Sequence, residues 1–334
     1  MGIARQTMYV STTQPRVEYL SLDTLSINPM ELIIAISHTM DMSHPGLTDH
    51  NLKVTALSEA IGREMGLPPK TQRNLVIAAA LHDIGALTND EKMSLLTFET
   101  PDDTHAEVGY ALLSLFPPFE GAAQMVRHHH TPWGPGNKGH CADEAHTGSC
   151  ILALADRVAL LMDSGISTGE PPEAILRRTL DRGAGLFHPA PLTALAALSR
   201  DVELWKVLRT GGLVPYLQKR VRLIPFAISG EQLVGLGELF AHLVDFQSPF
   251  TATHSAGVAH VAETLAGLFG FTPHEQLLMR TAGYLHDLGK LAIGEKLIGK
   301  RATLSASEIT DVRAHALHTR ACLKAISDFE PITS

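Results

Sequence analysis

The pattern of apolar and polar positions predicts a protein built almost entirely of helices. Between residues 50 and 65, apolar side chains recur every three or four positions, which is the spacing of an amphipathic helix. The segment from Thr71 to Asp83 is nearly all apolar and should form a central buried helix. Further helical patterns begin near positions 29, 104, 121, 148, 171, 231, 254, 275 and 305. Residues 1–28 are different, because a weak alternation there indicates an irregular or β-like arm.

One short pattern occurs twice, each time at the end of a strongly apolar helix. Leu-His-Asp-x-Gly covers residues 81–85 and again residues 285–289. A further histidine lies 32 residues upstream in both copies, His50 before His82 and His254 before His286. A short match that also carries a distant histidine at equal spacing indicates an internal repeat. We therefore expect an all-α fold of two tandem helical modules: after the arm (1–28), a first domain (29–212), a linker (213–230) and a second domain (231–334).

Composition narrows the class of protein. The 334 residues, 45% hydrophobic and 19% charged, are enough for two domains with separate cores. The net charge of −8 argues against binding to polymeric nucleic acid, which favours a basic face. The three cysteines form no CxxC pair, and no segment reads as a signal peptide or membrane span, so we expect a cytoplasmic protein without membrane contact. The unusual number is 18 histidines, several of them in the repeated segments.

These histidines and the neighbouring aspartates are candidate metal ligands. Nitrogen and carboxylate donors without thiolates suit iron, manganese, zinc or nickel. In an adjacent His-Asp pair, the imidazole can bind one ion while the carboxylate bridges to a second. Two ions about 3.5–4 Å apart can clamp a phosphodiester and generate a hydroxide nucleophile near neutral pH. The candidates are His50, His82, Asp83, His105, His128, His129, His130 and Asp156 in the first module, and His254, His286, Asp287 and His315 in the second.

Each candidate also has a structural explanation when it is taken alone. A single histidine on an apolar helix face is more often a hydrogen-bonded core residue than a ligand. A His-Asp dipeptide can be an ordinary helix end, the triple histidine 128–130 can be an exposed loop, and Asp156-Arg157 can be an internal ion pair. The repeat and the number of candidates together favour metal sites.

The chain resembles the HD superfamily of metal-dependent phosphohydrolases and, more closely, its HD-GYP branch. The first module matches at His50, at Leu81–Gly85, at His105, at the paired histidines and at residues 154–158. The second matches at residues 286–297 and in its histidine segment 315–319. The resemblance implies two tandem HD-type helical bundles and a site for two divalent ions, iron or manganese first and zinc or nickel as alternatives. It also implies hydrolysis of a cyclic dinucleotide such as cyclic di-GMP, with Asp83, Asp287 and Lys290 as catalytic residues.

The sequence departs from the HD-GYP pattern in three ways. Lys290 follows the second motif, where it could hold a phosphate oxygen, but Ala86 stands at that position in the first. The Gly-Tyr-Pro signature is absent, since residues 131–136 read Thr-Pro-Trp-Gly-Pro-Gly. Gly46 and Phe250 stand where three-metal members of the family carry a glutamate, so we expect two ions.

The predicted function is therefore a metal-dependent phosphodiesterase for a cyclic dinucleotide. Only the first module has a full ligand set in this sequence, because the second lacks counterparts of the last ligand-bearing helices. The alternatives are a phosphohydrolase of other specificity, a metal-containing nucleotide sensor without catalysis, and a tandem interaction domain with a vestigial site. The predicted partner is a small phosphate-containing ligand, with no nucleic-acid polymer and no membrane, and a homodimer is left open.

Overall fold

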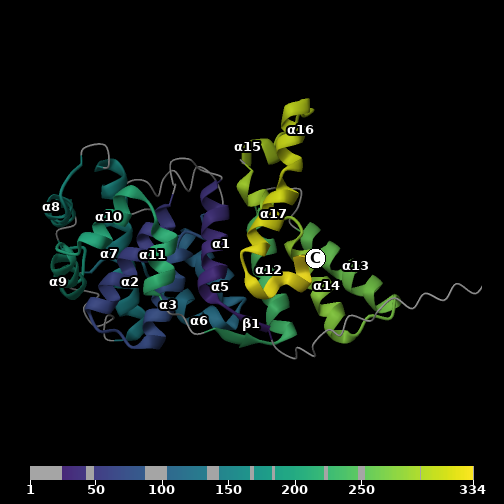
Figure 1. Ribbon diagram of the computed structural model, residues 1–334, viewed down its shortest axis with the longest axis horizontal. Helices are drawn as coiled ribbons and strands as arrows, with labels where there is room; N and C mark the ends of the chain where they lie inside the picture. Colours follow the sequence, from purple (N-terminus) through teal and green to yellow (C-terminus); the bar gives the residue numbers. More distant parts are fainter. Residues whose placement is uncertain are drawn as a thin grey trace, which may run out of the picture.

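Helices make up nearly all of the described structure, a computed structural model covering residues 25–42, 49–86, 104–133, 143–165, 169–182, 185–221, 225–246, 253–293 and 295–333. Residues 1–24 of the predicted arm lie outside these ranges. The two strands within them, β1 (Leu25–Ile27) and β2 (Phe226–Ile228), pair antiparallel with Leu25 opposite Ile228. Figure 1 shows two groups of helices side by side along the longest axis. The prediction of an all-α fold is confirmed.

The first group of helices surrounds α2 (His50–Glu64). Six of the described helices pack against it: α1 (Pro29–Met42), α3 (Pro69–Ala80), α7 (Glu144–Gly165), α9 (Pro189–Leu198), α10 (Val202–Thr210) and α11 (Leu213–Arg220). Every residue from His50 to Gly62 is consequently buried, whereas an amphipathic pattern predicts only one buried stripe. The remaining members of the group are α5 (Thr104–Ser114), η2 (Pro117–Phe119), α6 (Glu120–Arg127) and α8 (Pro172–Arg182).

Helix α7 is the one helix among the described residues that is long and apolar enough to cross a membrane by length and composition. In its most apolar window, however, 72% of the residues are buried inside the protein. It packs against α2, α3 and α6, so its apolar character is accounted for by the core. This central position carries Asp156 into the interior.

The second group begins with α12 (Gly230–Phe246), α13 (His254–Leu268) and α14 (Pro273–Leu285). Helix α14 starts at Pro273 because Thr272 and Glu275 form a capping box, in which each side chain accepts a hydrogen bond from the other residue's backbone N–H. The chain continues through η5 (Leu288–Ala292), α15 (Glu295–Ile298), α16 (Ala306–Arg313), α17 (His315–Lys324), η6 (Ser327–Phe329) and α18 (Glu330–Thr333).

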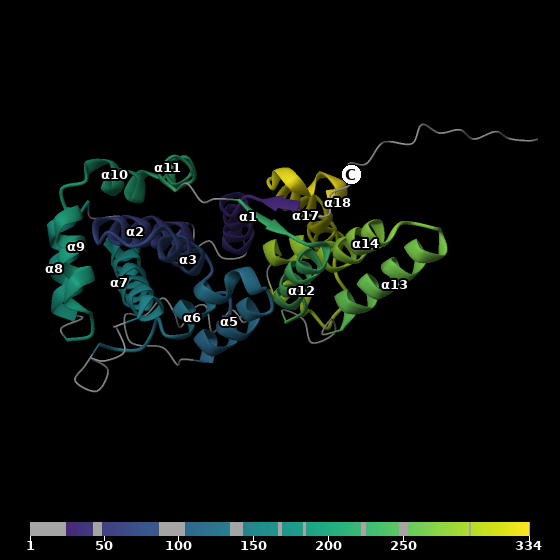
Figure 2. The same ribbon diagram turned by 90° about the horizontal axis from the view of Figure 1, so that it is seen from below.

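Helix α1 (Pro29–Met42) lies between the two groups (Figure 2). It packs against α2 and α3 on one side and against η5 and α17 on the other. The Ser37 hydroxyl donates to the Ala80 carbonyl oxygen at 3.2 Å, and the Cys322 thiol donates to the Ala35 carbonyl oxygen at 3.5 Å. One hydrophobic cluster thus extends from the first group through α1 into the second. The range 213–230 contains α11 and β2, and the division into domains on either side of it stays a prediction.

Candidate metal centres

Each Leu-His-Asp-x-Gly motif forms a turn at the buried C-terminal end of a helix, α3 or α14. The motif glycine lies directly against the helix that carries the next histidine. A Cβ atom on Gly85 would overlap the carbonyl oxygen of His105, and one on Gly289 would overlap that of His315. Glycine therefore permits the close approach of the His-Asp turn to this helix. The same contact in both groups makes His105 the structural counterpart of His315.

The ring of His82 is fixed by the backbone so that one nitrogen faces two carboxylates. Its Nδ1 lies 2.9 Å from the Ala79 carbonyl oxygen, and because that oxygen only accepts, Nδ1 carries a proton. Its Nε2 lies 3.2 Å from Asp83 Oδ2 and 3.8 Å from Asp156 Oδ1. An outer partner on one ring nitrogen orients a histidine to bind metal through the other. His286 repeats the arrangement, with Nδ1 2.8 Å from the Gly283 carbonyl oxygen.

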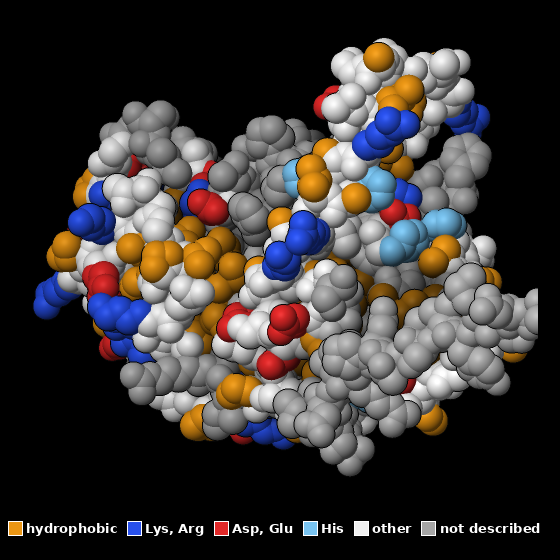
Figure 3. All heavy atoms as spheres, turned by 45° about the vertical axis from the view of Figure 1, so that its right-hand side comes forward, with side chains coloured by type: hydrophobic (Ala, Val, Ile, Leu, Met, Phe, Trp, Pro, Cys, Tyr) orange, Lys and Arg blue, Asp and Glu red, His pale blue; other side chains and the backbone are white. Residues whose placement is uncertain are grey.

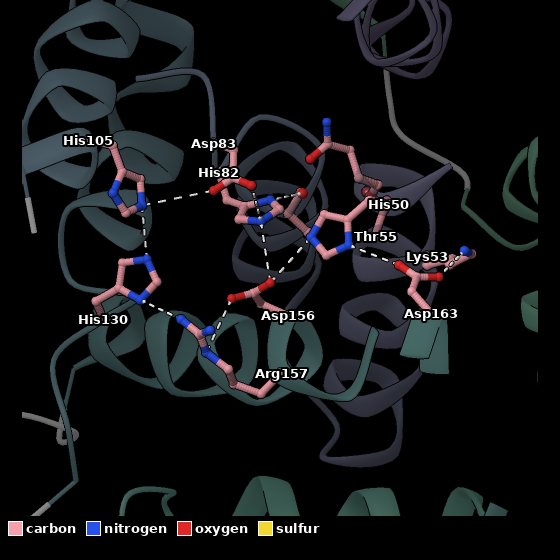
Figure 4. A network of polar contacts seen from close by, with 12 residues as sticks. His50, Lys53, Thr55, His82, Asp83, His105, His130, Asp156, Arg157 and Asp163 are labelled. Atoms are coloured by element: carbon pink, nitrogen blue, oxygen red, sulfur yellow. Dashed lines mark hydrogen bonds and ion pairs between the residues drawn. The ribbon is translucent and has the colours of Figure 1, made fainter. Parts of the chain in front are cut away.

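Helices α2 and α7 bring His50 and Asp156 into the same cluster. His50 Nε2 lies 3.3 Å from Asp156 Oδ1. His50, His82 and Asp83 each offer a ligand atom, and these atoms lie within 4.8 Å of one another. Figure 4 shows the Asp156 carboxylate between the His50 and His82 rings. Residues far apart in the sequence therefore meet at the packed surfaces of α2, α3 and α7.

A neighbouring triad comes from α5 and from the residues that follow α6. His105, His129 and His130 also offer ligand atoms within 4.8 Å of one another. His105 Nε2 lies 2.9 Å from His130 Nε2 and 3.9 Å from Asp83 Oδ1, so Asp83 lies between the two triads. His129 Nδ1 contacts the Val126 carbonyl oxygen, and its buried Nε2 has no hydrogen-bond partner in the part of the chain that the structure describes. Seven predicted residues thus form one buried cluster.

Charge balance in this cluster depends on its two carboxylates. Burial alone would lower the pKa of His50, but contacts with Asp156 and Asp163 outweigh it and raise that pKa to about 9. Burial would also lower the pKa of His82, but the charge of Asp83 and the contact with Asp156 outweigh this effect and raise that pKa to about 10. Burial lowers the pKa of His130 to about 4. Protons on His50 and His82 therefore balance the carboxylates in the metal-free protein.

The donor set fits divalent transition metals. It consists of imidazole nitrogens and carboxylate oxygens, which suit such ions. Among the described residues, the buried Nε2 of His129 has no hydrogen-bond partner and that of His82 faces only carboxylates, and a bound cation would satisfy both nitrogens. A divalent ion could also replace the two protons that balance Asp83 and Asp156, since metal binding displaces protons from histidines.

His128 lies apart from this cluster, although the sequence analysis included it among the candidate ligands. Its ring stacks on His146, with ring centroids 5.0 Å apart, while His129 and His130 turn into the cluster. Burial and the nearby His146 lower the pKa of His128. Helix α6 ends at Arg127, and the three consecutive rings point in different directions along the turn that follows. The geometry therefore gives His128 no part in the metal cluster.

The second motif gathers a more open cluster around Asp287. Lys290 Nζ lies 2.6 Å and His254 Nε2 lies 3.6 Å from Asp287 Oδ2. His315 Nε2 lies 3.3 Å from Asp287 Oδ1. The side chain of His254 is 45% exposed, compared with 3% for its counterpart His50. Figure 3 shows histidine and basic side chains gathered at the surface on this side of the molecule.

The difference in exposure follows from how α13 and α2 are packed. Helix α13 packs chiefly against α12 and α14, and its outer face exposes Val261 and Leu265, while Phe269, directly after its end, is exposed as well. These side chains line an apolar groove that also includes His254. Within the described parts of the chain, no helix covers α13 as α7 covers α2. The second site therefore lacks a described carboxylate in the position of Asp156.

Three charged residues around the first cluster had not been named as site residues. Asp163 Oδ2 lies 3.6 Å from His50 Nδ1, and Lys53 forms an ion pair with Asp163. Arg157 contacts both Asp156, at 3.6 Å, and His130 Nδ1, at 3.3 Å, so the ion pair considered from the sequence is present. Lys53 follows His50 by three residues and Asp163 follows Asp156 by seven, which places each pair on one helix face. That spacing could have placed Lys53 and Asp163 on the faces that carry His50 and Asp156, but it does not show that the two side chains are partners.

Comparison with known protein families agrees with this geometry. The HD domain family matches residues 47–161 and 251–329, which include both clusters and more than half of the chain. The chain therefore belongs to the HD domain family, and the resemblance to the HD superfamily is confirmed.

The chain is similar to phosphodiesterases of Vibrio cholerae. It is 23% identical over 312 residues to the 3'3'-cGAMP-specific phosphodiesterase 1, a match that covers 90% of this chain and 72% of that protein. It is 33% identical over 93 residues to phosphodiesterase 3, covering 28% of this chain and 20% of that protein. A solved structure of a cyclic GMP-AMP-specific phosphodiesterase from V. cholerae matches with a TM-score of 0.64 and 19% identity, covering 90% of this chain and 80% of that one. The structural likeness supports the helical fold.

Proposed function

We propose that this protein is a metal-dependent phosphodiesterase that hydrolyses a cyclic dinucleotide, with its working site in the first helical group. The observation that carries the proposal is the arrangement of His82 and His129. In each ring, Nδ1 is held by a backbone carbonyl and Nε2 faces into the cluster. His82 Nε2 faces the carboxylates of Asp83 and Asp156, and the buried His129 Nε2 has no hydrogen-bond partner among the described residues. Leaving such an atom unsatisfied is costly, whereas a metal ion would use it. Membership of the HD domain family and the activity for which the V. cholerae relatives are named support this class of enzyme.

Two divalent ions fit the division of the cluster into two triads. We assign His50, His82 and Asp83 to one ion and His105, His129 and His130 to the other. Asp83 lies between the two triads, within 3.9 Å of His105 Nε2, and Asp156 would complete the site on the side of His50 and His82. When bound, such ions supply Lewis acidity and an activated water for phosphodiester hydrolysis. Iron or manganese are the first candidates, with zinc and nickel as alternatives.

The chain's own residues prepare this site before any metal binds. Backbone carbonyls fix the rings of His82 and His129, and Arg157 contacts both Asp156 and His130. Burial of these groups excludes bulk water, which strengthens electrostatic interactions inside the site. Of the predicted catalytic residues, Asp83 belongs to this site, while Asp287 and Lys290 belong to the second.

For the substrate we propose 3'3'-cGAMP first and cyclic di-GMP second. The names of the V. cholerae relatives refer to 3'3'-cGAMP, and the resemblance to the HD-GYP branch implied cyclic di-GMP. Both carry two phosphodiester bonds that the same chemistry would cleave. A cytoplasmic location and the absence of membrane and nucleic-acid contacts stay predictions from the sequence.

The test is metal content combined with hydrolysis. The purified chain, loaded with Mn²⁺ or Fe²⁺, is incubated with 3'3'-cGAMP, cyclic di-GMP and cyclic di-AMP, and the products are separated by chromatography. We expect about two bound ions in the first cluster. The double variant His82→Ala/Asp83→Ala should lose these ions and the hydrolysis. A metal-loaded chain that cleaves none of the three dinucleotides would contradict the proposal.

The exposure of the second cluster favours a second candidate function. In this alternative, the first cluster holds its metal as a structural or sensing element, and hydrolysis occurs around Asp287. Lys290 contacts Asp287 there, whereas Ala86 occupies the corresponding position in the first motif. The double variant His286→Ala/Asp287→Ala separates the two possibilities. If it abolishes hydrolysis while the first cluster keeps its metal, the alternative is correct.

A further inference from the structure

His50 is contacted by carboxylates on both ring nitrogens. On one side, Nε2 lies 3.3 Å from Asp156 Oδ1, inside the metal cluster. On the other side, away from the cluster, Nδ1 faces Asp163 Oδ2 at 3.6 Å, an ion-pair contact slightly longer than a hydrogen bond (Figure 4). Asp163 in turn forms an ion pair with Lys53. The ring therefore lies between a carboxylate of the site and a second carboxylate behind it.

The packing of α2 against α7 builds this arrangement. His50 and Lys53 are one turn apart on α2, and Asp156 and Asp163 are two turns apart on α7. The Lys53 side chain is only 10% exposed and that of Asp163 is 23% exposed. Charged groups this far from water are rarely left without a partner. The Lys53–Asp163 ion pair therefore belongs to the packed interface between the two helices.

His50 needs such a partner because of its place in the fold. His82 and His129 follow the ends of α3 and α6, where the carbonyl three residues earlier holds Nδ1. His50 is instead the first residue of α2, so the helix itself supplies no carbonyl three residues before it. A carboxylate facing Nδ1 can replace the carbonyl oxygen, since it keeps the proton on Nδ1 and leaves Nε2 to bind metal.

We propose that Asp163, held in place by Lys53, is a positioning residue that orients His50 for metal binding. The inference rests on the metal site of the proposed function. It concerns the first cluster specifically, because Gly257 occupies the position three residues after His254 in the second. A Cβ atom on Gly257 would meet nothing within 4 Å, so no comparable charged pair supports His254 from that position.

The experiment measures metal affinity of the full chain in the absence of substrate. All variants carry His286→Ala/Asp287→Ala, so that only the first cluster binds. Metal-stripped protein is titrated with Zn²⁺ against a chromophoric chelator, and with Mn²⁺ by calorimetry. Asp163→Leu should weaken binding about 10- to 100-fold. Asp163→Asn should restore most of the affinity, because its amide oxygen can still accept the Nδ1 proton.

Two further variants separate positioning from a general effect on α2. Lys53→Met should weaken metal binding less than Asp163→Leu, because Asp163 stays present but loses its anchor. Arg63→Met is the matched control: it also removes a cation from α2, one that pairs with Glu59 away from the cluster, and should leave the affinity unchanged. Circular dichroism spectra verify that each variant folds. If Asp163→Leu does not fold, the metal affinities of Asp163→Asn and Lys53→Met test the positioning role of Asp163.

Several results would overturn the inference. These are wild-type affinity in folded Asp163→Leu or Lys53→Met, equal losses in Asp163→Asn and Asp163→Leu, or an equal loss in the Arg63→Met control. Absence of metal binding before any change at Asp163 would overturn both the inference and the proposed function. Tight metal binding without hydrolysis of any cyclic dinucleotide would overturn the proposed function alone.

Discussion

Replacing Asp156 with asparagine tests whether the charge balance of the first cluster stabilises the metal-free protein. Asp156 is buried and contacts His50, His82 and Arg157. Burial would lower the pKa of His50, and the contact with Asp156 is the largest of the effects that raise it, to about 9. Asparagine has a similar shape and no charge. The variant should therefore lose most of this rise in the pKa of His50.

The sign and size of the effect follow from proton linkage. A histidine whose pKa rises from 6.5 to about 9 on folding stabilises the folded state by roughly 3 kcal/mol below pH 6.5. This stabilisation is lost as the pH rises from 6.5 through 9. His82 acts in the same direction, since its pKa is raised to about 10. The pKa of Asp83 is lowered, so Asp83 is ionised throughout this window and adds no slope.

The wild-type, metal-free chain should consequently lose several kcal/mol of unfolding free energy between pH 6 and pH 9.5, whereas Asp156→Asn should show a loss smaller by roughly 2 kcal/mol. The assay is urea unfolding followed by circular dichroism in the presence of a chelator. Glu203→Gln is the control, because Glu203 is an exposed carboxylate that pairs with Arg220 at the surface. The same pH dependence in wild type and Asp156→Asn would refute the reasoning.

Three further outcomes are expected. Metal binding at pH 7 should release protons from His50 and His82, whose pKa values are raised, and the metal affinity should increase up to about pH 9. Calorimetry in buffers of different ionisation enthalpy measures the number of protons released, and binding without proton release would contradict the prediction. Gly85→Ala should destabilise the chain by about 1–3 kcal/mol by overlapping the His105 carbonyl, while Gly257→Ala, in open space, should leave the melting temperature unchanged or raised. His128→Ala should retain its bound metal by elemental analysis, and metal loss would show that His128 is a ligand.

The sequence was sufficient to predict the features that depend on local spacing. The repeated motif, with its upstream histidine, predicted two similar helical modules, and both motifs form the same turn against the next histidine helix. The candidate ligands of the first module, except His128, lie in one cluster. Their spacing was informative because each occupies a helix end or one helix face.

Features that depend on packing between distant helices could not be predicted in this way. Three consecutive histidines do not indicate which rings turn inward, and the answer depends on where α6 ends. Lys53 and Asp163 are ordinary charged residues in the sequence, and they become partners only when α2 packs against α7. Helix α1 was predicted as part of the first module, but its contacts extend to η5 and α17 in the second group.

Burial explains why the same motif has acquired two different surroundings. In the first cluster, His82 is fully buried, so each charge must be matched within the protein, and Arg157 and the Lys53–Asp163 pair supply further charged partners. In the second cluster, water reaches the exposed His254 and can screen its charge. Lys290, from the motif itself, is then the close cationic partner of Asp287. A motif covered by further helices thus requires support from those helices, whereas an open one can rely on its own residues.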